Sequence, residues 1–310
     1  MGLKEVIYII ILFILLGALF AGVFYLWQNL PQDSLELNPY YANISKEFPI
    51  ESYQFSPNMR YKDKQITFSL EVQCTEKNKN DAKSALALIQ ERTVLTFRQA
   101  EEGEIKILCS EVAPEPEESN HFIAGEGGPT RVIDSTSFAV ILEGKVSLFR
   151  PETCKTPQIA THEILHALGF DHNSNTSSIM YPITNCAQTI DQKIIDEISR
   201  VYSTPSLPDL AIESIEANKS GRYLNFKAVI ANHGLKDSQS SSLKVSVEGE
   251  EVKSFQLDEI LIGYKRILTI SNLQLPRKTD KVLFEIETAE QEISKEDNIA
   301  EITIIQNGDD

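Results

Sequence analysis

The feature that most constrains the fold is the stretch ATHEILHALGFDHNSNTSSIMYP, Ala160 to Pro182, which holds three of the five histidines in a 310-residue chain. His162 and His166 are spaced i, i+4, so on a helix their imidazoles project from one face. Gly169 predicts a left-handed stop after the helix, which lets His172 approach from another direction. The segment therefore predicts a helix and a sharp turn that bring three imidazoles together.

Three neutral imidazoles suit Zn²⁺ at about 2.0–2.1 Å, and three protein ligands leave a fourth position for water. We expect His162, His166 and His172 to bind one catalytic Zn²⁺. Glu163 is the expected general base, which takes a proton from the zinc-activated water and passes it to a leaving amine. The alternative is that these are ordinary residues on a helix face. Gly169 and His172 at fixed offsets lower the chance expectation below roughly one in ten thousand.

HEILHALGFDH followed by SIMYP resembles the metzincin signature with its Met-turn, and most resembles matrixin-like peptidases. The resemblance extends from about Met59 to Tyr202. It implies an α+β metzincin catalytic domain with a mixed twisted sheet, two long helices and a final helix. It also implies that Met180 forms the apolar floor beneath the metal, and that the enzyme is a zinc metalloendopeptidase acting on peptide or protein substrates.

The N-terminus carries 21 uncharged residues from Val6 to Leu26, enough for a helix to span the hydrocarbon core of a bilayer. We expect residues 1–27 to be a single-pass transmembrane anchor. A cleaved signal peptide is the alternative, but the stretch is longer than the usual apolar region and ALFAG is a poor cleavage site. Lys4 precedes the stretch and acidic residues follow it, which predicts a cytoplasmic N-terminus and an extracytoplasmic catalytic domain at the cell membrane.

The length fits two domains, and changes in pattern suggest where they lie. Residues 28–52 lack clear periodicity and predict a stalk or linker. Residues 53–204 form the expected zinc peptidase domain, which STPSLPDL separates from the rest. Seven short alternating runs then predict an antiparallel β-sandwich over residues 207–306.

The runs LPDLAIESIEA, VIANHG and SKEDNIAEITI resemble the immunoglobulin-like, cell-adhesion-related (CARDB-type) module of bacterial surface proteins. The resemblance implies a binding or spacer role for the C-terminal domain and a surface ligand as a partner. Two classes of function follow. The first is a membrane-anchored zinc endopeptidase, and the second is a surface adhesion protein with a structural or inactive metal site. The presence of Glu163 favours the first, because a structural site has no use for a base.

Several elements are expected within the peptidase domain. Alternation predicts strands over 64–72, 104–110, 137–143 and 145–149, with a turn at Gly144. Apolar spacing predicts helices over 80–100 and 190–202, and Thr156 is the expected cap of the histidine helix. The stretch from His121 to Asp134 is either the rim of the cleft or a structural turn. His121 itself is expected to be a surface or packed histidine.

Four cysteines permit two disulfides, with three pairings open. Cys154 and Cys186 both flank the histidine segment, which favours that pair and leaves Cys74 with Cys109. Four buried free thiols are the alternative, although an oxidising exterior suits disulfides. The formal charge of −16 repels phosphate backbones, so we expect no nucleic-acid partner.

Overall fold

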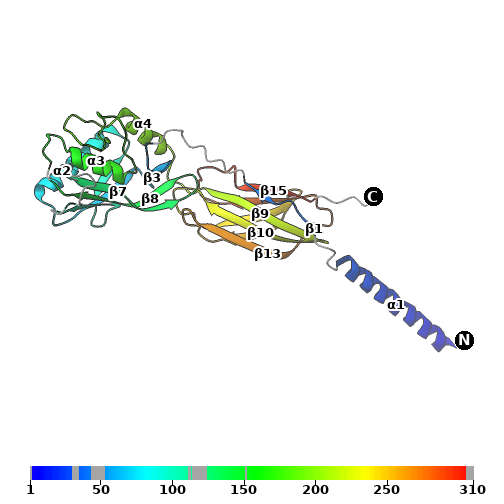
Figure 1. Cartoon of the computed structure of the whole chain (residues 1–310). Coiled ribbons are helices and arrows are strands. Elements are labelled where there is room, and N and C mark those ends of the chain that lie inside the picture. The colour runs from blue at the N-terminus through cyan, green and yellow to red at the C-terminus, as the bar shows by residue number, and fades with distance from the viewer. Residues whose placement is uncertain are drawn as a thin grey trace.

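The computed structural model describes residues 2–29, 35–42, 53–110, 113, 124–150 and 152–304, so His121 lies outside the described residues. Figure 1 shows a domain of two β-sheets that lies between the N-terminal helix on one side and a mixed α/β domain on the other. Helix α1 (Leu3–Asn29) is long and apolar enough to cross a membrane, and its side chains from Lys4 to Tyr25 are not covered by the rest of the chain.

Among the described residues of the α/β domain, six strands form one sheet. Five parallel strands lie in the order β3-β8-β6-β4-β5, and β7 pairs antiparallel with β8 at the edge. The strands are β3 (Met59–Tyr61), β4 (Gln65–Leu70), β5 (Thr96–Gln99), β6 (Ile105–Cys109), β7 (Gly125–Asp134) and β8 (Ala139–Leu148). Helices α2 (Glu76–Arg92), α3 (Gln158–Ala167) and α4 (Gln192–Val201) share one apolar core with this sheet. The expected mixed sheet with packed helices is confirmed.

The expected limits of the first helix of this domain are wrong. Helix α2 begins at Glu76, after Thr75, whose hydroxyl accepts a hydrogen bond from the Asn78 N–H (3.2 Å). It ends at Arg92, and part of the remaining segment forms β5. The helix predicted over residues 80–100 therefore starts earlier and ends earlier than expected, because a capping threonine and a following strand set its limits.

The expected turn at Gly144 is also wrong, because β8 passes through this residue without a break. A Cβ atom at Gly144 would lie 3.2 Å from the carbonyl oxygen of Ala167 and would overlap the hydroxyl of Tyr61. The glycine is thus required for the close approach of α3 to the sheet. Gly144 therefore allows α3 to pack closely on β8, and it does not reverse the chain.

The C-terminal domain consists of two antiparallel sheets packed around a second apolar core. One sheet contains β9 (Leu210–Ser220), β10 (Tyr223–Asn232) and β13 (Lys265–Gln274). The other has the order β12-β11-β14-β15, formed by β11 (Ser241–Val247), β12 (Glu250–Leu257), β14 (Lys281–Glu287) and β15 (Ile299–Thr303). The expectation of short antiparallel strands in this region is confirmed.

Part of the expected stalk belongs to this domain. Strands β1 (Leu35–Glu36) and β2 (Tyr40–Tyr41) pair antiparallel with β9. Leu37 is only 7% exposed and lies in the apolar core, and Tyr40 packs against the same core. The stalk predicted over residues 28–52 is therefore wrong for residues 35–42, since apolar side chains in a segment without periodicity fill the edge of a distant sheet.

The tip of the β7–β8 hairpin packs against the C-terminal domain. A small buried apolar cluster contains side chains of both domains: Val140, Leu235 and Ile262. The buried hydroxyl of Ser135 donates a hydrogen bond to the carbonyl of His233 (3.2 Å). Gly263 lies so close that a Cβ atom would be 2.6 Å from Cγ2 of Ile133. The hairpin that carries β7 is thus held by both domains (Figure 1).

A buried carboxyl group makes the stability of the C-terminal domain depend on pH. Asp209 is 7% exposed, and its Oδ1 accepts a hydrogen bond from the Ser294 N–H (2.8 Å). Burial is the main cause that raises the pKa of Asp209 from 3.8 to about 6. The charges of Asp297 and Glu292 act in the same direction, whereas the Ser294 hydrogen bond opposes the shift.

We expect Asp209→Asn to stabilise the protein at pH 7.5 but not at pH 3.5. The unfolded chain loses this proton near pH 3.8 and the folded chain near pH 6, so wild-type stability is lost as the pH rises through this window. The gain should be about 1–2 kcal/mol after allowance for solvent screening, or a few degrees in Tm. Thermal unfolding measures it, with Asp258→Asn, whose side chain is 84% exposed, as the control. An equal Tm difference at both pH values would contradict the assignment.

Candidate metal centre

Helix α3 carries two of the three histidines and Glu163 inside the α/β domain, where all are buried. Its N-terminus is capped by Glu152, whose Oε2 accepts a hydrogen bond from the Ile159 N–H (2.9 Å). A carboxylate is favourable at this end of a helix because it faces the positive end of the dipole. The expected cap is therefore wrong, since the Thr156 hydroxyl accepts instead from Nε2 of Gln158 (3.0 Å).

Gly169 turns the chain out of the helix. Its φ of 97° lies in the left-handed region, and its N–H donates to the carbonyl of His166 (2.8 Å). A side chain here would also meet the core, because a Cβ atom would lie 2.7 Å from Cγ of Met59. The expected left-handed stop is confirmed, and it brings His172 back toward the helix.

The three histidines meet at their Nε2 atoms. The Nε2 atoms of His162 and His166 are 3.0 Å apart, those of His166 and His172 are 3.1 Å apart, and those of His162 and His172 are 3.2 Å apart. Among the described residues, no other group of three histidine, cysteine or acidic side chains has its ligand atoms so close together. This spacing lets one metal ion contact all three nitrogens.

Backbone carbonyls fix the orientation of two of these rings. Nδ1 of His162 lies 2.6 Å from the Ile179 carbonyl, and Nδ1 of His166 lies 2.7 Å from the Phe170 carbonyl. A carbonyl oxygen only accepts, so Nδ1 holds the proton and Nε2 keeps a free lone pair. Burial lowers the pKa of each ring to about 4, with a further contribution to His162 from its neighbour His166. Neutral rings with converging lone pairs fit Zn²⁺.

Glu163 lies on the side of α3 that packs against β7, and only 7% of its surface is exposed. Strand β7 lies so close that a Cβ atom at Gly125 would be 2.6 Å from Cγ of Glu163, and one at Gly127 would overlap the Glu163 carbonyl. Burial, followed by the charge of Glu126, raises the pKa of Glu163 to about 8. A divalent cation nearby would favour the carboxylate form.

The segment expected as either a rim or a turn is thus a strand from Gly125 to Asp134 that borders the metal centre. The turn alternative is wrong for these residues. Gly127 is required because the strand contacts the backbone of α3 there, and Gly125 because the strand contacts the side chain of Glu163.

Met180 is fully buried in a turn that follows the third histidine. Its N–H donates to the Ser178 hydroxyl (2.9 Å), and its carbonyl accepts from the Asn173 N–H (2.9 Å). The preceding residue, Ile179, supplies the carbonyl that orients His162. The turn therefore helps to place the first histidine.

Both cysteine pairs form disulfides, Cys74 with Cys109 and Cys154 with Cys186. The second bond joins the segment before α3 to the loop after Met180. A disulfide sulfur is not a thiolate, so Cys154 is not available as a fourth metal ligand.

A short segment before β3 supports the loop of the third histidine. The Phe55 N–H donates to the Gly169 carbonyl, and the Asp171 N–H donates to the Tyr53 carbonyl, both at 2.9 Å. The Phe55 ring stacks on His166, with 5.7 Å between ring centroids. No sequence pattern marks Phe55, because a single aromatic residue outside any periodic segment carries no signal.

The comparisons with known proteins agree with this geometry. The family model described as matrixin matches residues 60–203, and the model described as CARDB matches residues 207–299. A comparison with curated proteins found no match. Residues 60–203 are therefore the domain of a matrixin family metalloendopeptidase with a zinc-binding histidine triad, and a CARDB domain follows it. Both expected resemblances are confirmed.

We expect Gly127→Ala to disturb the metal centre, whereas Gly128→Ala should not. The added methyl group at residue 127 would overlap the Glu163 carbonyl, while a Cβ atom at residue 128 meets nothing within 4 Å. Overpacking of this kind costs about 1–3 kcal/mol. Thermal unfolding and peptidase activity measure the effect. The same stability and activity in both variants, whether reduced or unchanged, would contradict a specific need for glycine at residue 127.

Proposed function

We propose that this protein is a membrane-anchored, extracytoplasmic zinc metalloendopeptidase. The observation that carries the proposal is the meeting of three Nε2 atoms at a helix that also carries the buried carboxyl group of Glu163, the residue after the first histidine. His162, His166 and His172 would hold the ion. The matrixin domain implies peptide substrates.

Zinc, when bound, supplies a Lewis acid that polarises a substrate carbonyl and lowers the pKa of water. Glu163 acts in this proposal as the general base. It takes a proton from the attacking water and gives it to the leaving nitrogen when the C–N bond breaks. Packing against the backbone of β7 holds its carboxyl group in place. Met180 provides the apolar floor that the matrixin resemblance implies.

Strand β7 offers a place for the substrate backbone. Among the described residues it pairs only with β8, so its other edge has unpaired backbone groups next to Glu163. An extended peptide can add to such an edge through main-chain hydrogen bonds. This supports cleavage of extended or unfolded segments.

The organisation of the chain is part of the proposal. Residues 53–204 would have the metzincin fold and residues 207–306 an immunoglobulin-like sandwich. Residues 1–27 would cross the membrane with the N-terminus in the cytoplasm, and the exposed apolar surface of α1 supports this role. The two disulfides suit an oxidising exterior.

The second candidate function is a surface adhesion protein with a structural or inactive metal site. The CARDB domain favours adhesion-related binding. The buried carboxyl group of Glu163, on the helix that carries two histidines of the triad, favours a peptidase, because a structural site needs no base. In the peptidase, the C-terminal domain would position the catalytic domain through the buried contact at Leu235.

Replacing Glu163 separates the two candidates. Glu163→Gln keeps the shape of the side chain but cannot accept the proton, so peptidase activity should fall about 10²–10⁴-fold while zinc content stays the same. Glu91→Gln, at an exposed position on α2, is the matched control. Cleavage of an unfolded protein substrate by the zinc-loaded protein measures the change. Equal activity of wild type and Glu163→Gln would contradict the role of Glu163.

Cell fractionation tests the anchor. We expect the protein in the membrane fraction, released by detergent but not by high salt, with Val6 to Leu26 still present by intact mass. Replacing Leu12 and Leu15 by lysine should abolish retention, because charges at the centre of a membrane helix cost several kcal/mol. A mature chain that starts after Leu26 would show a cleaved signal peptide instead.

A further inference from the structure

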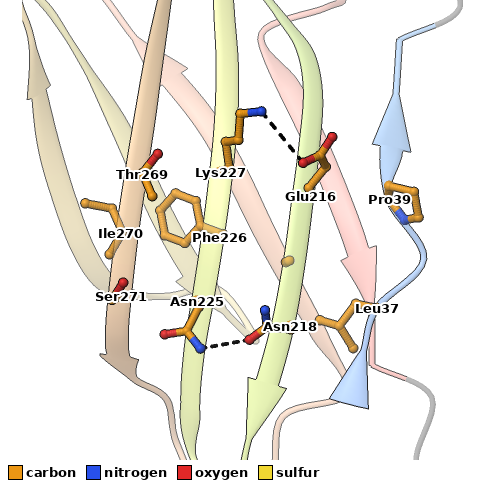
Figure 2. Close-up of a pocket in the computed structure, with 11 residues that line it drawn as sticks. Leu37, Pro39, Glu216, Asn218, Asn225, Phe226, Lys227, Thr269, Ile270 and Ser271 are labelled. Carbon is orange, nitrogen blue, oxygen red and sulfur yellow. Dashed lines mark hydrogen bonds and ion pairs between the residues drawn. The ribbon is translucent and has the colours of Figure 1, made fainter. Parts of the chain in front are cut away.

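The C-terminal domain carries an open groove of about 400 Å³ on the sheet that contains β9, β10 and β13. Figure 2 shows the groove side chains of these strands together with Leu37 and Pro39 from the N-terminal segment. Because β1 and β2 pair with β9, this segment closes one end of the groove. The groove therefore depends on residues that precede the catalytic domain in the chain.

The strand register shows that the groove lies on the outer face and crosses the strands. Its floor is the backbone of three paired residues whose side chains belong to the core side: Ala217, Phe226 and Ile270. The residues on either side of them point outward and form two walls. One wall contains Glu216, Lys227 and Thr269, and the other contains Asn218, Asn225 and Ser271.

The walls are polar but carry no net charge. Nζ of Lys227 lies 3.9 Å from Oε2 of Glu216, and about half of each side chain is exposed. Nδ2 of Asn225 donates to Oδ1 of Asn218 at 2.8 Å (Figure 2). Oδ1 of Asn225 accepts from the Asn272 N–H, also at 2.8 Å. These bonds hold the amides in fixed orientations, so their remaining hydrogen-bonding groups are preorganised for a ligand.

A row of three apolar or aromatic side chains and one serine borders the charged wall. The register places Tyr41, Ser214, Val229 and Ile267 side by side across the same face. Tyr41 is 63% exposed, since Tyr40 before it points into the core. This row lies outside the groove, beyond the wall of Glu216, Lys227 and Thr269, where only a ligand broader than the groove would contact it.

We propose that this groove binds a neutral, hydroxyl-rich glycan chain. A pyranose ring presents hydroxyl edges, which match the amide and hydroxyl walls, and apolar C–H faces, which match Leu37 and Pro39 at the end of the groove. Three strand spacings of about 4.8 Å give the groove a length of roughly 15 Å, enough for several linked sugar units. The inference concerns the binding partner of the CARDB domain and does not depend on peptidase activity.

Other ligand classes fit less well. The pairing of Lys227 with Glu216, on a chain of net charge −16, disfavours anionic polymers. A peptide that binds a sheet through its backbone adds to a strand edge, whereas the backbone groups of the groove floor are already used in strand pairing.

Saturation-transfer NMR on the full-length protein in detergent micelles tests the proposal. The probes are neutral tetrasaccharides of glucose, mannose, galactose and N-acetylglucosamine, with a sulfated oligosaccharide and an unstructured peptide as comparisons. We expect transfer to at least one neutral tetrasaccharide. Asn218→Ala should weaken its affinity about tenfold, as expected for the loss of a hydrogen-bonding amide. Thr269→Trp should abolish binding by filling the groove.

Ser254→Trp is the matched control, because Ser254 is an exposed strand residue on the other sheet. Unchanged thermal unfolding of Thr269→Trp shows that the domain is folded, since aromatic residues suit exposed strand positions. The proposal is overturned if no neutral tetrasaccharide binds, if Thr269→Trp binds as tightly as wild type, or if only the sulfated probe or the peptide binds.

Discussion

The metal centre depends on two hydrogen bonds from imidazole Nδ1 atoms to backbone carbonyls, one between His162 and Ile179 and one between His166 and Phe170. They select the tautomer that leaves Nε2 free and stop the rings from turning away. Both carbonyls belong to loops that follow α3, so the loops orient the helix residues. The third histidine, His172, is carried by the same stretch of chain. Ligand geometry is therefore a property of the whole helix–loop–turn segment.

Close packing around α3 holds the helix that carries His162 and His166, and two glycines permit this packing. Gly144 lets β8 approach Ala167, and Gly127 lets β7 lie against Glu163. The same hairpin reaches the C-terminal domain near Leu235. Residues 35–42 pair with β9, so chain segments on both sides of the catalytic domain attach to the C-terminal domain. The catalytic domain is thus connected to the C-terminal domain at three places: through the chain before it, through the chain after it and through the β7–β8 hairpin.

The sequence predicted local chemistry better than long-range contacts. The histidine spacing, the left-handed Gly169 and the alternating strands of the C-terminal domain were predictable because each depends on neighbouring residues. The turn predicted at Gly144 is wrong, since a glycine that permits close packing looks the same in sequence as one that makes a turn. Leu37 and Phe55 lie in segments without periodicity, and their partners are far away in the chain. Such contacts depend on tertiary structure, which no local pattern encodes.

Three neutral imidazoles are proposed to hold one zinc ion. X-ray absorption at the zinc edge, combined with metal analysis of the purified protein, tests this coordination. We expect one zinc per chain, with three imidazole nitrogens at about 2.0–2.1 Å, one oxygen donor and no sulfur. Absence of stoichiometric zinc, fewer than three imidazole ligands or a zinc–sulfur distance near 2.3 Å would contradict it.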